Sequence, residues 1–487
     1  MRPGPKSETL AAVRSFRILS LACAIFALAL TCSAASSASS TQPLGGWAQV
    51  EITPPLGIAL GGRGGPETVA TKVLDPLFAQ VIYLKDGKGA GFVLVSFDLV
   101  GLPHDLSDRL RFDIVNELGV EWNLVLLNTS HTHSGPYMIR SLMAGVGPPP
   151  TIEQEYFKLL EEKIISATRT AAAHLQPIKA EVFRGTSQVG INRRGKNKQG
   201  AMGMIPNADA PFEDKVWVLR VTPTNGQPPA IVFSYACHPV IAYGYGYSAI
   251  SADFPGVARN VLRDKLGSGV HAQFVQGFAG DIRPRVVADL EHGRFRASKP
   301  ADLQQAGTDL AETIVASMKT DGQTLALDFA GTADRPFLPR GEPPPRQFYE
   351  KMRTNALAIT NEFHVAVSDY WLKRYDSGQG FARGDAWSLG LIRLAQNQWI
   401  VHSAGEPVIE WRAKISQWLA PLNIVPFGYS QEAKSYLPTE ALLPEGGYEV
   451  LDSNQARAST PAPYTNGIES AIRDSLLAQL EFIRAKR

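Results

Sequence analysis

The feature that most constrains this chain is an apolar run of strand length that ends in a loop with two histidines. Residues 122–127 read Trp-Asn-Leu-Val-Leu-Leu, and residues 128–136 read Asn-Thr-Ser-His-Thr-His-Ser-Gly-Pro. Alternate side chains of an extended segment share a face, so we expect His131 and His133 to point into one site. Neutral imidazole is the commonest metal ligand in proteins. The pattern therefore fits a metal site, and it fits equally two loop histidines that bond to local backbone groups.

The composition is that of a globular protein. The chain has 487 residues, of which 44% are hydrophobic and 19% charged, and this is ample material for a large core. The formal net charge is only +2, so no electrostatic footprint indicates a nucleic-acid partner.

The first 40 residues have the pattern of a signal peptide. An apolar run at 18–30 is preceded by basic residues and followed by a small-residue stretch at 33–40. The run is short for a membrane span. We therefore expect a secreted or periplasmic protein cleaved between Ala34 and Ser40, or else one that keeps the leader as an anchor. Cys237 is then the only cysteine of the mature chain, so we expect no intrachain disulfide.

Strand and helix patterns alternate along the chain and favour an α/β (α+β) fold. Runs at 75–84 and 91–98 flank the turn Asp86-Gly87, which predicts a hairpin. A helix at 104–118 and a strand at 124–127 follow, so we expect a βαβ unit and a mixed β-sheet core with flanking helices, in one domain over 41–487. Two more hairpins are expected at 216–222/230–235 and 387–395/399–403. Further expected strands lie at 45–54, 181–191, 271–276 and 423–428, and further expected helices at 151–174, 255–266, 301–318, 348–371, 407–419 and 467–484.

Three expected strand ends each deliver a residue of metal-ligand type. His131 follows the strand at 124–127, His238 follows 230–235, and Glu406 follows 399–403. Two imidazoles and a carboxylate match the protein ligands of a catalytic zinc site with an open position, and they favour zinc over magnesium or calcium. We therefore expect the metal site at strand ends and loops. Each residue also has a plain structural role open to it: His238 as a hydrogen-bonded buried side chain, Glu406 as a complement to a helix dipole.

The loop His131-Thr-His-Ser-Gly-Pro136 resembles the H-T-H-S-G-P signature of neutral ceramidases, the zinc amidases that cleave N-acylsphingosine. Other blocks resemble that family in the same order, over residues 45–449. They are Ile191-Asn-Arg193, Cys237-His238-Pro239 with Ile250-Ser-Ala-Asp253, Gly280-Asp281, Gly405-Glu406-Pro407, and the pair Tyr436 and Tyr448.

The resemblance implies a fold, a metal and a set of roles. One Zn²⁺ per chain would be held by His131, His238, Glu406 and Tyr436, while His133, Arg193 and Tyr448 would contact the scissile amide. A tyrosine ligand is unusual, and Tyr436 can equally be a buried aromatic with a hydrogen-bonded hydroxyl. The implied substrate is a small-molecule or lipid N-acyl compound, such as ceramide, and association with a membrane surface is compatible with it. The oligomeric state is left open.

Two departures from the family pattern bear on the substrate. Arg283 stands where the family carries a serine once proposed as nucleophile, so a serine acyl-enzyme cannot form there, whereas a route through activated water needs no serine. Arg283 can narrow the pocket, bind an anionic group, or form a salt bridge. Because the sequence ends soon after Tyr448, we also expect the family's C-terminal immunoglobulin-like domain to be missing.

Two alternatives to a lipid amidase stay open. One keeps the zinc site but cleaves another bond, as an esterase or a deacetylase that acts on a non-lipid substrate. The other is a non-catalytic zinc-binding relative. The presence of His133, Arg193 and Tyr448 beside the expected ligands favours an enzyme, because a purely structural site has no use for them.

Overall fold

The computed structural model describes residues 42–63, 67–138, 149–455, 457 and 461–486. The expected signal peptide lies outside these ranges. None of the helices within them combines the length and the hydropathy that a bilayer crossing needs.

The first half of the main sheet contains the predicted βαβ unit. Its strand order is β1-β3-β4-β5, with bounds β1 Leu44–Glu51, β3 Phe78–Lys85, β4 Gly91–Phe97 and β5 Val125–Thr129. Asp86 closes the β3–β4 hairpin, because its Oδ1 accepts hydrogen bonds from the backbone N–H groups of Lys88 and Ala90. Helix α2 (His104–Leu118) then returns the chain so that β5 runs parallel to β4. The hairpin and the βαβ unit are both confirmed.

The second half of the main sheet repeats this plan. Its order is β6-β9-β10-β12, with bounds β6 Gln176–Thr186, β9 Lys215–Pro223, β10 Ala230–Tyr235 and β12 His271–Gln276, and β16 (Gln323–Leu325) pairs with β6. The predicted β9–β10 hairpin is confirmed. Helix α4 (Asp253–Leu266) leads into β12, which is parallel to β10.

The single strand predicted at 181–191 is wrong, because the chain leaves the sheet after Thr186. A new strand, β7 (Gly190–Lys196), pairs instead with β8 (Met202–Asn207) and β13 (Ile282–Pro284). The Gly190 N–H bonds to the hydroxyl of Tyr235, and a Cβ on Gly190 would lie only 2.8 Å from Ile282. A side chain at this position would therefore clash with β13.

The two halves of the main sheet contact each other at both pairs of edge strands, β1 with β6 and β5 with β12. Strands β1 and β6 pair through only two residue pairs, Leu44↔Pro177 and Gly45↔Gln176. At the other side, side chains bridge β5 and β12: Asn128 Oδ1 accepts from the backbone N–H of Gln276 at 2.8 Å. The histidine-bearing ends of both halves are thereby brought next to each other.

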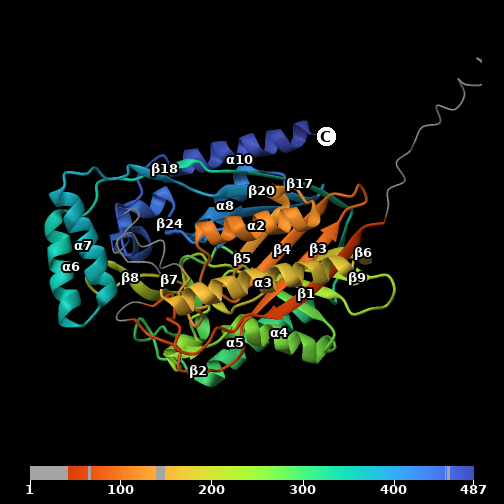
Figure 1. Ribbon diagram of the computed structural model, residues 1–487, viewed down its shortest axis with the longest axis horizontal. Coiled ribbons are helices and arrows are strands. Elements are labelled where there is room, and N and C mark those ends of the chain that lie inside the picture. Colours follow the sequence, from red (N-terminus) through yellow and green to blue (C-terminus); the bar gives the residue numbers. More distant parts are fainter. Residues whose placement is uncertain (1–41, 64–66, 139–148, 456, 458–460, 487) are drawn as a thin grey trace, which may run out of the picture. The chain divides into compact units, whose positions relative to one another are not determined.

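A second sheet packs on the main sheet, and helices cover the outer faces of both. The second sheet has the order β17-β20-β21-β23, with bounds β17 Leu327–Asp334, β20 Leu389–Ala395, β21 Gln398–Ser403 and β23 Ile424–Phe427. The helices are α3 (Thr151–Ala173) with α2 on the first half, α4 with α5 (Pro300–Ser317) on the second, and α8 (Glu410–Trp418) with α10 (Ile468–Ala485) on the second sheet (Figure 1).

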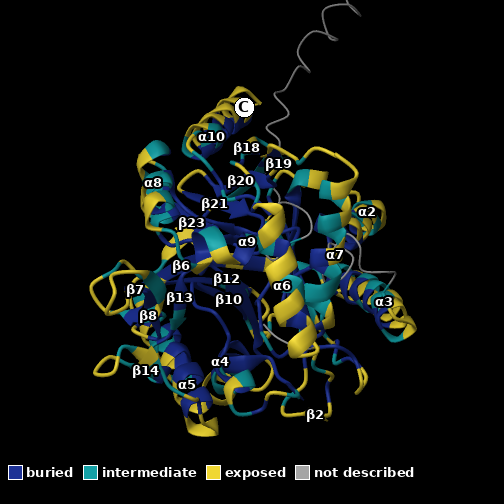
Figure 2. Ribbon diagram, turned by 90° about the vertical axis from the view of Figure 1, so that its left-hand side faces the viewer, coloured by how far each residue is buried: buried dark blue, intermediate teal, exposed yellow. Residues whose placement is uncertain are grey.

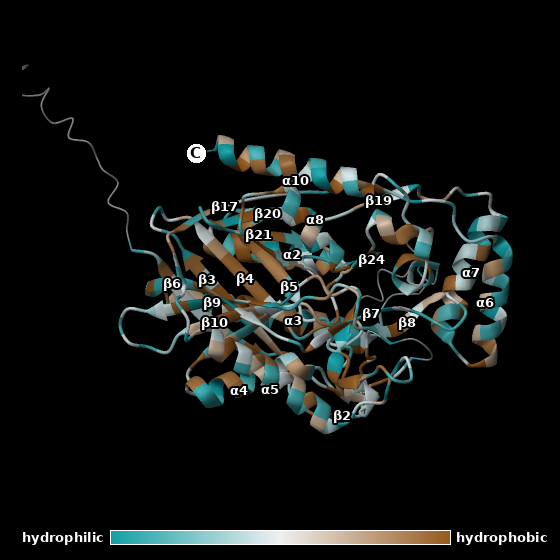
Figure 3. Cartoon of the chain, turned by 180° about the vertical axis from the view of Figure 1, so that it is seen from behind, coloured by the Kyte–Doolittle hydropathy of each residue, from teal (hydrophilic) through white to brown (hydrophobic). Residues whose placement is uncertain are grey.

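Side-chain alternation along each strand builds the layers. On β4, Val93 and Val95 pack toward α2 and α3, whereas Phe92 and Leu94 pack toward the second sheet. Strands buried on both faces read as continuous apolar runs, and β3 and β4 are accordingly hydrophobic in Figure 3. In Figure 2, which is coloured by burial, β10 and β12 are buried along their whole length.

The helix predicted at 348–371 is two helices, α6 (Arg346–Ala358) and α7 (Glu362–Asp376). Thr360 between them has a φ of +52°, which no helix continues through. The side chain of Asn361 then caps α7 by accepting from the backbone N–H of His364.

The remaining described elements are short. They are β2 Lys72–Val73, β11 Ala249–Ile250, β14 Ala288–Asp289, β15 Arg294–Phe295, β18 Phe337–Pro339, β19 Gly384–Ala386, β22 Glu406–Pro407, β24 Tyr436–Leu437, α9 Ser453–Gln455, the 3₁₀ turns Trp122–Leu124, Ala242–Gly244, Arg285–Val287 and Glu440–Glu445, and a π-helical turn Tyr448–Asp452.

A buried ion pair ties α4 to the end of β4, and we expect it to matter for stability. Arg259 donates to both carboxylate oxygens of Asp98, and both side chains are at most 3% exposed. Arg259→Met leaves a buried carboxylate without its partner, so we expect a loss of about 3–5 kcal/mol in the free energy of unfolding. Chemical denaturation checks this. The control is Arg169→Ala, which removes the exposed pair with Glu117 and should leave the free energy of unfolding nearly unchanged.

Candidate metal centre

The parallel pair β4–β5 positions His131. The residue lies two positions after β5, and its backbone N–H donates to the carbonyl of Leu99 at 2.9 Å. Its ring atom Nδ1 lies 2.6 Å from the carbonyl of Val100. Both carbonyls directly follow the end of β4. His131 has a φ of +66°, so the expected extended backbone is wrong. The rings of His131 and His133 nevertheless lie 4.9 Å apart between centroids.

The parallel pair β10–β12 positions His238 in the same way. Its Nδ1 lies 2.7 Å from the carbonyl of Ala279, in the loop after β12. Gln276, the last residue of β12, connects the two histidine loops, because its Nε2 donates to the carbonyls of both Ser130 and Cys237 at 2.9 Å. Each histidine is thus held by the loop after a neighbouring parallel strand, and one buried amide joins the two loops.

Glu406 and Tyr436 reach this point from the short parallel pair β22–β24, in which they are register partners. Oε2 of Glu406 lies 3.3 Å from Nε2 of His131 and 3.2 Å from Nε2 of His238. The hydroxyl of Tyr436 lies 3.5 Å from Nε2 of His238. The structure therefore brings together all four side chains for which the resemblance implied metal ligation.

The electrostatics of this group call for a cation. In both His131 and His238, Nδ1 faces a carbonyl, so it carries the ring proton and leaves a lone pair on Nε2. Burial, reinforced by Arg193, lowers the pKa of His238 to about 4, which keeps that ring neutral. Two lone pairs and a carboxylate then face each other, and a metal ion between them relieves this repulsion.

His133 adds a third imidazole to the group. The ligand nitrogens of His131, His133 and His238 all lie within 4.8 Å of one another. Nε2 of His133 is buried and has no hydrogen-bond partner. Burial, followed by the charges of His131 and His238, lowers the pKa of His133 well below its usual value. This imidazole is therefore neutral and free to bind an ion or to accept a proton.

Arg193 and Tyr448 line the same site. Arg193, on β7, is buried, and its Nε donates to Glu449 at 2.8 Å. Its guanidinium carbon lies 5.4 Å from the ring centre of Tyr436 and 5.7 Å from that of Tyr448. One terminal nitrogen, Nη2, is buried without a partner. Tyr448 is 38% exposed, so it forms the solvent edge of the site.

The chain is similar to two solved structures. One is neutral ceramidase from Pseudomonas aeruginosa, at 15% identity and a TM-score of 0.69, over 92% of this chain and 75% of that one. The chain has the neutral ceramidase fold. The other, a ceramidase complexed with C2, gives 14% identity and a TM-score of 0.69 over 92% and 76% of the two chains. No protein-family model and no curated protein sequence matches the chain.

Two residues of the site were not found from the sequence. The ring of Tyr429 lies 4.4 Å from that of His131, and its buried hydroxyl has no partner. Glu449 accepts from Arg193 and Arg194, and it is buried. Neither belongs to a block of the ceramidase pattern. The available signal was position: Tyr429 directly follows an expected strand, and Glu449 is an acidic residue next to Tyr448.

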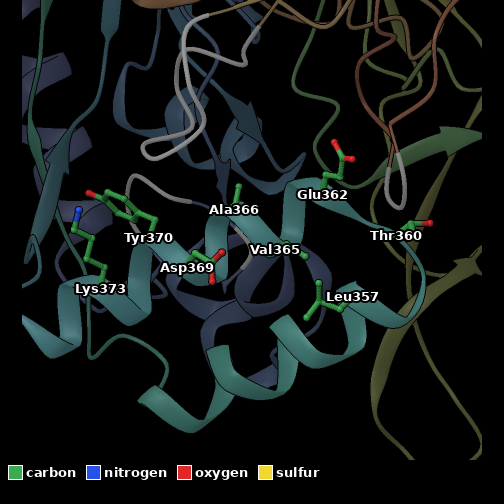
Figure 4. A pocket seen from close by; sticks show the side chains of 8 residues that line it. All are labelled: Leu357, Thr360, Glu362, Val365, Ala366, Asp369, Tyr370 and Lys373. Atoms are coloured by element: carbon green, nitrogen blue, oxygen red, sulfur yellow. The ribbon is translucent and has the colours of Figure 1, made fainter.

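One cleft of this fold lies away from the metal centre. It has a volume of about 630 Å³ and is formed by α6, α7 and the turn between them, as Figure 4 shows. The residues that line it include Leu357, Val365 and Tyr370, and none of them belongs to the group around Glu406. The cleft therefore gives no information on the substrate of that group.

The charge arrangement predicts that a divalent metal stabilises the protein. At a free Zn²⁺ concentration one hundred times the dissociation constant, we expect about 2.7 kcal/mol of added stability, measured by thermal unfolding of metal-free protein with and without added ion. His238→Ala should remove this shift. The control, His271→Ala, alters a buried histidine at the far end of β12 and should keep it. An unchanged shift in His238→Ala would contradict the site.

Proposed function

We propose that this chain is an exported zinc-dependent hydrolase that cleaves the amide bond of an N-acylated substrate, ceramide or a related N-acyl lipid. Residues 41–487 are its catalytic domain. The observation that carries the proposal is the buried carboxylate of Glu406, which faces the Nε2 atoms of two histidines at 3.2 and 3.3 Å. Export is supported by the signal-peptide pattern of residues 1–40.

The proposed ligands of one zinc ion per chain are His131, His238, Glu406 and Tyr436. Nitrogen and oxygen donors of this kind suit zinc. Burial, followed by the charge of Glu406, raises the pKa of Tyr436 well above its usual value, so this hydroxyl stays protonated unless a cation binds next to it. When bound, zinc lowers the pKa of a water ligand to about 7 and polarises a carbonyl oxygen.

The roles of the remaining side chains follow from the hydrogen-bond donors and acceptors that they leave available. Nη2 of Arg193 has no hydrogen-bond partner among the described residues, so it can donate to an oxygen that gains negative charge during attack on the amide. The hydroxyl of Tyr448, at the solvent edge, can donate to the same oxygen. Neutral His133 can accept a proton on its free Nε2 and pass it to the departing amine. A purely structural metal site would leave these buried groups without a purpose.

An acyl-amide substrate is favoured by the fold, because the two solved structures that it resembles are described as ceramidases. We predict that the protein without residues 1–40 hydrolyses N-acyl amides, that a zinc chelator abolishes the activity, and that added Zn²⁺ restores it. A substrate panel of N-acyl amides, matched acyl esters and N-acetyl sugars, assayed together with the zinc content, decides between the candidates. Turnover of only esters or acetyl groups would favour an esterase or a deacetylase. Stoichiometric zinc without any turnover would indicate a non-catalytic relative.

A pair of variants separates ligands from proton carriers. Glu406→Gln should lose zinc and activity together, since the amide no longer offers a negative charge to the ion. His133→Gln should keep its zinc while kcat falls by about 10²–10⁴. Elemental analysis and initial rates on the same samples give both readouts. Loss of zinc from His133→Gln would instead assign the ion to the three histidines.

A further inference from the structure

Arg63 lies beside His133, and no acidic side chain in the described part of the chain forms a salt bridge with it. Its Nε donates to the backbone carbonyl of His133 at 3.1 Å. Its guanidinium carbon lies 4.7 Å from the ring centre of Tyr247 and 6.0 Å from that of Tyr243. Both terminal nitrogens are buried without a hydrogen-bond partner, and burial lowers the pKa of Arg63 to about 10. Aromatic faces thus orient the guanidinium, while its two ends stay free.

Arg283 is a second such arginine, on β13. Its guanidinium carbon lies 4.4 Å from the ring centre of Phe295, and Nη1 lies 3.5 Å from the sulfur of Met204, a weak acceptor. The side chain also contacts the hydroxyl of Tyr243, and its Nε is buried without a partner. Within the described ranges, no carboxylate forms a salt bridge with Arg283, so the salt bridge, one of its three possible roles, is not found there.

The two arginines flank one wall of the metal centre. Both contact Tyr243, and the ring of Tyr243 lies 6.0 Å from that of His133. The neighbouring Arg193 and Arg194 are different, because Glu449 accepts from both of them at 2.8 Å. A largely buried cation without a counter-charge is costly. The wall next to His133 therefore carries positive charge that the described part of the protein does not balance.

We propose that Arg63 and Arg283 form a subsite for an anionic group, a carboxylate or a sulfonate, on the amine part of the N-acyl substrate. This rests on the proposed function, in which His133 faces the departing amine. Guanidinium groups bind such oxyanions through two parallel hydrogen bonds, and aromatic stacking pre-orients them for it. The amine of ceramide carries only hydroxyl groups, so the subsite indicates an N-acyl amino acid or a similar conjugate as the substrate class.

The test compares three lauroyl amides that differ in the amine. N-lauroylglycine carries a carboxylate, N-lauroyltaurine a sulfonate, and N-lauroylethanolamine no charge. For the zinc-loaded enzyme we expect kcat/KM to be at least tenfold higher for one or both anionic substrates than for the neutral one. The ratio of the two anionic values tells which group the subsite prefers. Arg283→Ser and Arg63→Gln should each reduce the preference at least tenfold, chiefly through KM.

Arg285→Gln is the matched control. Arg285 is two residues further along the chain, its guanidinium carbon lies 5.0 Å from the ring centre of Phe212, and its Nε donates to the carbonyl of Gln188. We expect Arg285→Gln to show the same ratio of kcat/KM between anionic and neutral substrates as the wild type. Because Arg63 and Arg283 lie on different segments, either variant carries the test if the other does not fold.

The outcomes separate this proposal from the proposed function. Hydrolysis of all three amides at equal kcat/KM, or a preference unchanged in both variants, overturns the anionic subsite and leaves the hydrolase intact. If no amide is cleaved, the proposed function fails, and calorimetric binding of N-lauroylglycine then decides on the subsite alone. Tenfold weaker binding to Arg283→Ser than to wild type would support it, and equal binding would overturn it.

Discussion

The site depends on one interaction. Two imidazole nitrogens point their lone pairs at the same buried carboxylate oxygen. Neither histidine can turn away, because a backbone carbonyl holds the opposite nitrogen of each ring. The protein thus holds two lone pairs and a carboxylate together at close range. A positive ion at their centre would relieve the repulsion between them.

Much of the fold was predictable from the sequence because its signals are local. The hairpins at Asp86 and at residues 225–226 follow from turn residues between apolar runs, and the βαβ unit follows from their order. The break between α6 and α7 was missed, since apolar residues continue on both sides of Thr360. The departure of β7 was missed because its cause is a contact with Tyr235 that is distant in sequence.

The site shows the same division. His131, His238 and Glu406 could be proposed from their places after strands, and the structure brings Nε2 of each histidine within hydrogen-bond distance of Glu406. His131 and His133 were predicted to point into one site because their loop would be extended. That reason was wrong, because the loop is not extended and a positive φ turns His131 inward. Tyr429, Glu449 and Arg63 could not be proposed, since their roles depend on which distant residues they contact.

The side chain of Gln276 has a consequence for how the site acquires its ion. It already satisfies backbone groups in both histidine loops, so the loops keep their shape through protein hydrogen bonds alone. The entropic cost of ordering the ligands is then met during folding and not at the moment of metal uptake. Uptake of an ion at this point would accordingly need no rearrangement of the two histidine loops.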